Sequence, residues 1–283
     1  MNLPDSTEIK KRQNEEENIM MQCASGYYFN IGERTNYICW VFCFLSAAIS
    51  FKGDQIFGVI AMLALDILTI VAGYIMTWSV KIAADLRELF DARVLFNNNE
   101  AFDSLKRQYL KEKALRIISV HKDHYEKISK TNGESNPPGK MDWYTFNKDF
   151  SPIYSQLECQ RQNKWWNKKM VKIRKIILVI ILVTLVGTGI IVFSKVTLSA
   201  IGLINAFGIV MFRVHERMRS HFKYHDTSVS IDTLYESASK NISIEKIENL
   251  QKYINERRHL PVFEMNIVHR LSATKYTKLY NQI

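Results

Sequence analysis

Four long stretches with almost no charged residue, arranged as two pairs, constrain this chain more than any other feature. The stretches are Thr35–Phe51, Gln55–Val80, Ile176–Ser194 and Val196–Phe212, and Asp66 is the one charge within them. A membrane core about 30 Å thick takes about 17–25 helical residues, which each stretch can supply. One to three residues join each pair, and backbone groups in lipid must form hydrogen bonds within their own helix. The sequence therefore predicts an all-α membrane protein with four transmembrane helices in two hairpins.

Basic residues indicate how the predicted hairpins are oriented. Within 15 residues of the spans, the N-terminal, central and C-terminal segments hold 15 Lys or Arg, whereas the connections hold Lys52 and Lys195. Lys and Arg collect on the cytoplasmic side of a membrane. A multi-pass protein with both termini and the central segment in the cytoplasm is therefore expected. Most of the net charge of +10 flanks the spans, where it meets anionic lipid, so the lipid bilayer is the first expected partner.

The spans divide the chain into segments of different character. We expect an N-terminal cytosolic helix over 1–34, a hairpin over 35–80, a central cytosolic segment over 81–175, a second hairpin over 176–212 and a C-terminal cytosolic segment over 213–283. The central and C-terminal segments are expected to build a helical cytosolic domain, because no run of alternating β-branched residues predicts a sheet.

Apolar residues at helical spacing predict the elements of the central segment. From Lys81 to Asn97 the spacing continues the second span as a helix into the cytosol. An amphipathic helix is expected over 101–130, with the following apolar positions: Phe102, Leu105, Tyr109, Leu115, Ile118 and Tyr125. The stretch 131–140, rich in Pro, Gly, Ser and Asn, predicts a break. Pro152 predicts the first turn of another helix.

The C-terminal segment is also expected to be helical. Helical patterns cover Ser230–Ser239 and Ile244–Glu256, and Leu260-Pro261 predicts a break before a last helix to Tyr280. The sequence holds no disulfide scaffold, because its 4 cysteines show no C-x-x-C spacing. Cys39 and Cys43, four residues apart in the first span, are expected to be small packing residues.

No motif of a known catalytic site occurs in the chain, so we expect no enzyme and no cofactor. The sequence lacks G-x-G-x-x-G, the P-loop, G-x-S-x-G and H-E-x-x-H. Two pairs of histidines share a helical face by their spacing: His121 with His124, and His221 with His225. No cluster of Cys, Asp or Glu near them in the sequence completes a ligand set, so no metal site is predicted.

A basic and aromatic stretch before the third span is compatible with nucleic-acid binding. It combines Trp165-Trp166 with Lys168-Lys169. Aromatic and basic residues are expected at a membrane boundary in any case, so no DNA or RNA polymer is predicted as a partner.

Polar and small residues inside the spans allow two interpretations. Asp66 shares a helical face with Thr69, Gly73 and Thr77, and Asn205 lies among small residues of the fourth span. A carboxylate in a span should face the bundle interior or a polar cavity, and small residues let helices approach closely. These residues either pack the helices tightly, with Asp66 hydrogen-bonded to a neighbour, or line a water path. A pore would require a homo-oligomer, because four helices of one chain enclose none.

Four motifs occur in a characteristic order along the chain. They are an N-terminal segment with Ile9, Gln13, Asn14, Glu17, Asn18 and Ile19, then Leu86–Asp91, Trp143-Tyr144 and Cys159–Trp166. In this order they resemble the SMODS-associating four-transmembrane effector family of bacterial anti-phage signalling (CBASS). The resemblance implies an inner-membrane effector that a cyclic oligonucleotide activates in the cytosol. It further implies an oligomer that permeabilises or disrupts the membrane and causes growth arrest or death.

A cyclic oligonucleotide needs cations for its phosphates and flat side chains for its bases. We predict that Trp143, Tyr144 and Arg161 contribute to its site, with Arg213 and Arg217 as alternative phosphate contacts. Two other functions stay open on the sequence alone. One is a small ion-coupled transporter or channel, and the other is a membrane scaffold that a protein partner triggers.

Overall fold

The computed structural model describes residues 3–50, 56–98, 101–165 and 200–263, together with 180 and 187, and for 50 and 200–207 the backbone alone. Within these residues the chain is helical, with a single isolated β-bridge between Asn132 and Met141. The helices are α1 (Ser6–Gln13), α2 (Glu16–Ser50), α3 (Ile56–Leu95), α4 (Ser104–Val120), α5 (Lys122–Ile128), α7 (Ala200–Lys240) and α8 (Ile244–Arg258). A further helix covers 152–165. The all-α prediction is confirmed for the described part of the chain.

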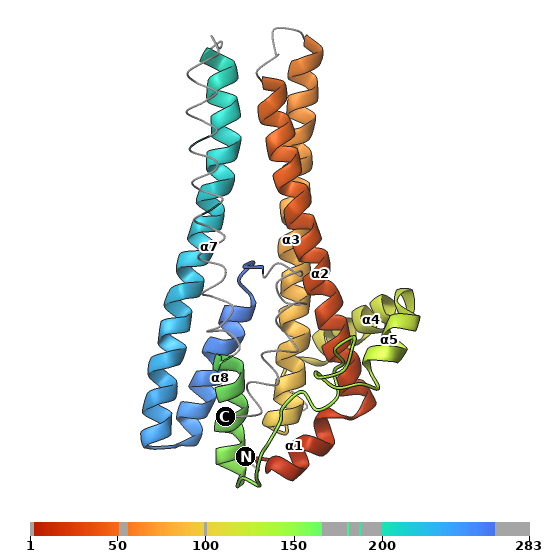
Figure 1. Cartoon of the computed structure of the whole chain (residues 1–283), viewed down its shortest axis with the longest axis vertical. Helices are drawn as coiled ribbons and strands as arrows, with labels where there is room; N and C mark the ends of the chain where they lie inside the picture. The colour runs from red at the N-terminus through yellow and green to blue at the C-terminus, as the bar shows by residue number, and fades with distance from the viewer. Residues whose placement is uncertain are drawn as a thin grey trace.

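Two long helices form the axis of the protein. α2 and α3, with 35 and 40 residues, run side by side along most of its length (Figure 1). At 1.5 Å per residue, α3 is about 60 Å long, twice the thickness of a membrane core. Its unbroken course from Ile56 to Leu95 confirms that the second predicted span continues into a helix beyond Lys81.

The C-terminal part of α2 and the N-terminal part of α3 present large apolar side chains to the outside. On α3 these run from Ile56 to Ile75, a distance of about 29 Å at the helical rise. An exposed apolar surface of this height matches the hydrocarbon core of a bilayer. Among the described residues, α3 is the one helix that is long and apolar enough to cross a membrane.

α7 is the third long helix, with 41 residues, and it starts within the predicted fourth span. It passes Arg213 without interruption and then turns back into α8, which packs beside it (Figure 1). The expected helix Ser230–Ser239 is thus the end of α7. The third predicted span, Ile176–Ser194, lies outside the described residues apart from 180 and 187, as does the expected last helix.

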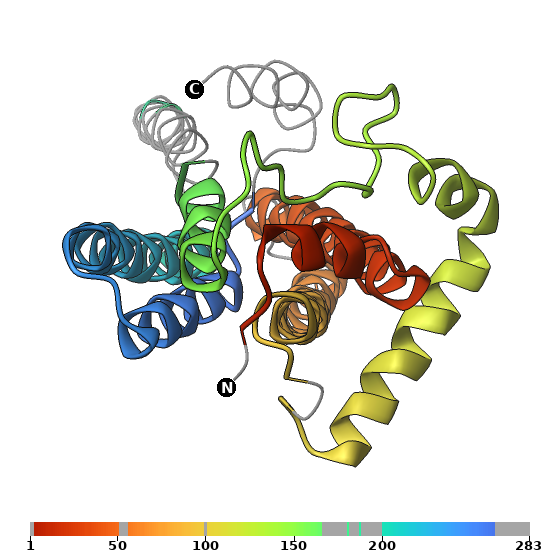
Figure 2. The same cartoon turned by 90° about the horizontal axis from the view of Figure 1, so that it is seen from below.

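The remaining helices surround the lower halves of α2 and α3. Seen from below, α4 and α5 lie on one side of this pair, and α7, α8 and the 152–165 helix lie on the other (Figure 2). One hydrophobic core joins all of these elements, with Met21, Leu86, Phe90, Leu110, Cys159 and Leu250 among its members. We call this part the helical module.

The expected helix over 101–130 is interrupted, and its predicted apolar positions divide into two groups: Phe102, Ile118 and Tyr125 pack in or against the core, whereas Leu105, Tyr109 and Leu115 are exposed. His121 leaves the helical conformation and ends α4 before α5 begins. Leu105 is 78% exposed, whereas Leu110 and Ala114 are fully buried. Leu105, Tyr109 and Leu115 lie on exposed sides of α4. The side of α4 that carries Leu110 and Ala114 is buried because it packs against α2.

The predicted breaks agree with the structure. The stretch 131–140 contains no helix, and the next helix begins at Pro152. α8 starts after Ser243, whose hydroxyl accepts a hydrogen bond from the backbone N–H of Lys246, and ends before Leu260. Such capping oxygens satisfy amide groups that have no partner in the first helical turn.

Candidate functional site

All four sequence motifs meet at Tyr144 in the centre of the helical module. The side-chain amide of Gln13 donates to the carbonyl of Tyr144 at 3.0 Å and accepts from its N–H at 2.8 Å. The Tyr144 hydroxyl donates to Asp91 at 2.8 Å and accepts from Asn163 at 3.2 Å. The residue is 1% exposed. Burial, assisted by the charge of Asp91, raises the pKa of Tyr144 well above its ordinary value, so the hydroxyl keeps the proton that it donates.

Asp91 connects these motifs to the C-terminal segment. Its second oxygen accepts hydrogen bonds from Arg258 at 2.6 Å and from Gln251 at 2.7 Å, both on α8. Burial opposes the charge of Arg258, but the contact with Asp91 outweighs it and raises the pKa of Arg258. Removing one partner of a buried ion pair costs about 3–5 kcal/mol. Asp91, Tyr144 and Arg258, which we call the Asp91 cluster, therefore hold α3, α8 and the loop before 152 in one arrangement.

A second carboxylate of α3 receives two cations. Asp85 accepts from His259 at 3.0 Å and from Lys106 at 3.3 Å. The hydrogen bond to Asp85 raises the pKa of His259, and burial raises the pKa of the neighbouring Glu88. Ligand atoms of Asp85, Glu88 and His259 lie within 4.8 Å of one another, so this group is the one in the described residues with the geometry for a metal ion. Because Lys106 and His259 already balance Asp85, no cation is needed to explain the group.

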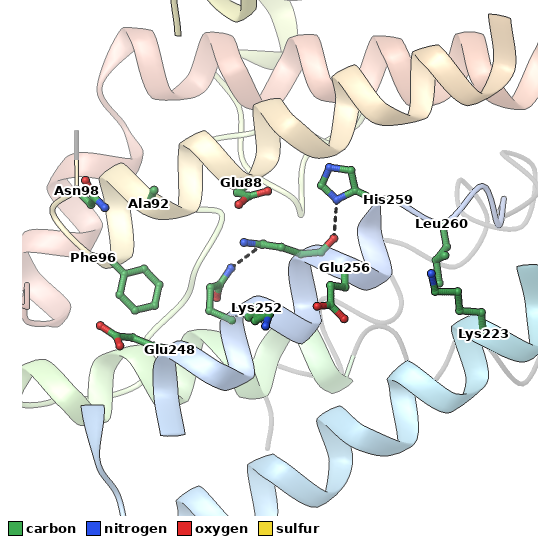
Figure 3. A pocket seen from close by; sticks show the side chains of 12 residues that line it. Glu88, Ala92, Phe96, Asn98, Lys223, Glu248, Lys252, Glu256, His259 and Leu260 are labelled. Atoms are coloured by element: carbon green, nitrogen blue, oxygen red, sulfur yellow. Dashed lines mark hydrogen bonds between the residues drawn. The ribbon is translucent and has the colours of Figure 1, made fainter. Parts of the chain in front are cut away.

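An open pocket of about 690 Å³ lies beside this group, between α3, α7 and α8 (Figure 3). Its charged lining is balanced, with three acidic and three basic side chains: Glu88, Glu248, Glu256, Lys223, Lys252 and His259. A lining with no excess of positive charge does not favour a polyanion. This pocket is therefore a poor fit for an oligonucleotide.

The structure separates the five residues that the sequence predicts as ligand contacts. Trp143 is half-buried beneath Arg87 and Lys140, while the hydroxyl and backbone of its neighbour Tyr144 are engaged in the module core. Arg161 donates two hydrogen bonds, both 2.8 Å long, to Glu158 on its own helix. Of this set, Trp143 alone lies beside cations that have no carboxylate partner among the residues that the structure describes.

Arg213 and Arg217 lie at a different place, one turn apart on α7 where it passes α2 and α3. Arg213 is 3% exposed and donates to Glu216 at 2.6 Å and to Asn36 of α2 at 3.1 Å. Arg217 donates to the carbonyl of Pro261 at 2.8 Å, and both guanidinium groups lie against the sulfur of Met76 on α3. We call Arg213 and Arg217 with these contacts the arginine joint. It fastens α7 to the α2–α3 pair next to the exposed apolar surface.

The predicted pore residues lie in the α2–α3 contact where they are described. The hydroxyl of Ser46, which is buried, donates to Asp66 at 2.5 Å, and Thr69 donates to a carbonyl of its own helix. A Cβ atom at Gly73 would lie 3.9 Å from Arg213, so this glycine lets the arginine approach α3. Asn205 lies on α7, and its side chain is outside the described residues. The hydrogen bond of Asp66 favours the packing interpretation, and the water path stays a prediction.

Several important residues carried no recognisable signal in the sequence. Asp85, Gln251, Arg258 and His259 acquire their roles through partners more than 20 residues away. Arg87 and Asp91 lie in the recognised Leu86–Asp91 motif, and their presence there was the one available indication. Among the described residues, neither of the two histidine pairs belongs to a group of side chains with the geometry for a metal ion. His124 instead shares a hydrogen bond with Tyr27 at 2.7 Å.

The described architecture is that of an all-helical membrane protein, in which long helices connect the exposed apolar surface of α2 and α3, which we call the apolar belt, to the helical module. The chain belongs to the SMODS-associating 4TM effector domain family, whose model matches residues 7–208. No curated protein and no solved structure matches the chain. The family confirms the resemblance that the ordered motifs indicated and supports the role of a membrane effector in SMODS-dependent anti-phage signalling.

Proposed function

We propose that this protein is the membrane effector of a bacterial anti-phage system, and that a cyclic oligonucleotide activates it in the cytosol. In the active form a homo-oligomer permeabilises or disrupts the inner membrane and thereby stops growth or kills the infected cell. Four transmembrane helices form the membrane part, and both termini lie in the cytoplasm. The family match over residues 7–208 is the observation that carries this proposal.

The continuity of the long helices supports a mechanism of coupling. α2, α3 and α7 each run from the helical module toward the apolar belt without a break. A hydrogen-bonded helix transmits displacement of one end to the other, whereas a loop would absorb it. A ligand that rearranges the module would therefore shift the spans.

The arginine joint is the expected point of rearrangement. The Nε atoms of Arg213 and Arg217 are buried and have no hydrogen-bond partner in the described residues. Each unsatisfied polar atom costs about 1–3 kcal/mol, so the resting arrangement carries a penalty that another arrangement of α7 can relieve. In the Asp91 cluster, by contrast, the carboxylate accepts hydrogen bonds from both Arg258 and Gln251. The residues of this cluster are therefore expected to move together.

We expect a nucleotide cyclase that makes the cyclic oligonucleotide to be encoded beside this protein. The proposal is tested by co-expression with that cyclase while membrane potential is followed with a voltage-sensitive dye. Depolarisation is expected with the active cyclase and not with a catalytically inactive one. Depolarisation that does not depend on the cyclase would contradict activation by a nucleotide. Growth arrest with an intact membrane potential would contradict permeabilisation and favour a scaffold that acts through a protein partner.

A further inference from the structure

Trp143 contacts two cations from different elements of the helical module. The guanidinium carbon of Arg87 on α3 lies 4.2 Å from the ring centre, and the ammonium nitrogen of Lys140 lies 5.0 Å from it. Such contacts are favourable, but they leave the charges unneutralised. Neither cation has a carboxylate within ion-pair distance in the described part of the chain.

Several other cations of the helical module, by contrast, have a carboxylate partner. Four of them form ion pairs with carboxylates: Arg93 with Glu17, Lys106 with Asp85, Lys164 with Asp232 and Arg258 with Asp91. The field of one carboxylate, that of Asp91, reaches Arg87, and it is opposed by the field of Arg258. Asp91 is already paired with Arg258, so Arg87 and Lys140 are left as two neighbouring positive charges with no carboxylate of their own in the described residues.

Burial and the neighbouring cations both disfavour the charged forms of Arg87 and Lys140. Burial, followed by the charge of Arg87, lowers the pKa of Lys140 to about 8. Burial, followed by the charge of Arg258, lowers the pKa of Arg87 to about 10. An anion between these groups would offset the penalty, because opposite charge favours the protonated forms.

Gln22 of α2 adds a hydrogen-bond donor without an acceptor. Its Oε1 accepts from Arg87, which fixes the amide orientation because a guanidinium group cannot accept. The Nε2 atom is buried and has no partner in the described residues, and the side chain is 0% exposed. A buried N–H without an acceptor is costly, so this donor also indicates a missing acceptor.

The ammonium group of Lys140 lies close to the backbone of α2. Gly26, one turn after Gln22, has no side chain, and a Cβ atom there would lie 4.0 Å from the ammonium nitrogen. Arg87 is 7 residues beyond Val80 on α3, about 10 Å along the helix from the end of the predicted span. The cations therefore lie on the cytosolic side of the predicted membrane boundary.

We propose that Arg87, Lys140 and Gln22 form a binding site for a phosphate group of a nucleotide, with Trp143 holding the two cations in place. The site rests on the proposed function, in which the cyclic oligonucleotide supplies the phosphate. Arginine and lysine donate charge-assisted hydrogen bonds to phosphate oxygens, and an amide N–H completes the set. The site assigns the phosphate contact to Arg87 and Lys140 and not to Arg161, which is bound to Glu158.

The test uses the purified full chain in neutral detergent and compares Lys140→Gln with Lys113→Gln. Lys113 is a matched control because its ammonium lies 5.2 Å from the centre of another tryptophan ring, that of Trp78, and no other cation of the described residues lies over that ring. Binding of inorganic phosphate, cyclic di- and trinucleotides and an anionic short-chain lipid is measured by equilibrium dialysis. Melting temperature is measured in phosphate-free buffer.

Lys140→Gln is expected to weaken nucleotide binding roughly tenfold to a hundredfold and to leave the melting temperature unchanged or raised. Lys113→Gln is expected to bind as the parent does. Equal nucleotide binding by Lys140→Gln and the parent would overturn the site, as would binding of the lipid alone. A marked loss of melting temperature in Lys140→Gln with unchanged binding would show that Lys140 merely fastens the loop.

Failure of the site is distinguishable from failure of the proposed function. If cyclase-dependent depolarisation occurs in cells that express Lys140→Gln as strongly as in the parent, the function stands and the site is wrong. If the purified parent binds nucleotide through Lys140 but never depolarises cells, the site stands and the permeabilising function is wrong.

Discussion

Replacing Asp91 by Asn should destabilise the helical module strongly while changing its shape very little. Asp91 is buried and accepts from Tyr144, Gln251 and Arg258 at 2.6–2.8 Å. The amide keeps one acceptor oxygen, but its NH₂ group replaces the other and faces either the Tyr144 hydroxyl or the donors of Gln251 and Arg258, and the charge of Arg258 loses its partner. Breaking a buried pair in this way costs about 3–5 kcal/mol. For a domain of this size that corresponds to a fall in melting temperature of about 6–20 °C.

Thermal unfolding of the detergent-purified chain, followed by circular dichroism and limited proteolysis, measures the effect. Glu8→Gln is a suitable control, because the Glu8–Arg12 pair is partly exposed and such pairs contribute about 0–1 kcal/mol. Adding Arg258→Met to Asp91→Asn should recover part of the loss, because it removes the unpaired cation. A fall below about 2 °C for Asp91→Asn would refute the role assigned to the Asp91 cluster.

Three further predictions concern titration, the membrane interior and topology. The bond to Asp85 raises the pKa of His259 above 6.5, so its stabilisation is complete below pH 6.5 and is lost as the pH rises through the folded-state pKa. Melting temperatures between pH 6 and pH 9 should fall in the parent and change less in His259→Gln. Asp66→Asn should express normally and reduce ion conductance several-fold, whereas Asp66→Leu should also alter the oligomer; equal toxicity of both would leave Asp66 a packing residue. A cysteine at Gly53 should react with an impermeant reagent from the periplasm and one at Glu134 should not, and the reverse would overturn the orientation.

Sequence patterns predicted the parts of the fold that local chemistry decides. The missing charges between Gln55 and Val80 and the helical spacing after Lys81 were sufficient for α3, because a long apolar helix needs no distant partner. The Pro- and Gly-rich stretch 131–140 was sufficient for the break before the 152–165 helix.

Long-range partners decided what the sequence could not reveal. Asp91 and Arg258 are 167 residues apart, and spacing along the chain contains no information about such a pair. Tyr144 was predicted to contact ligand because it is aromatic and follows Trp143 near a loop. In the structure its backbone and hydroxyl instead form hydrogen bonds with Gln13 and Asp91 in the core of the module. The motif residues identified the family, and the structure shows that several of them hold the module together.

The cation pair at Trp143 illustrates the same limit from the other side. Arg87 lies in a recognised motif and Lys140 in a loop, and nothing in their positions indicates that they share a ring. That neither cation has a carboxylate partner in the described residues could be recognised from the packing of the surrounding helices alone. A site defined by unbalanced charge therefore required the structure, although one of its residues, Trp143, was predicted from the sequence.

Dye release from liposomes tests the central claim most directly. The purified chain is reconstituted in liposomes that contain anionic lipid and a self-quenched dye, and cyclic di- and trinucleotides are added on the side of the helical module. At least one cyclic oligonucleotide should release the dye rapidly, and its linear counterpart and protein-free liposomes should not. Retention of the dye with every cyclic nucleotide, or equal release without any, would contradict a nucleotide-gated membrane effector.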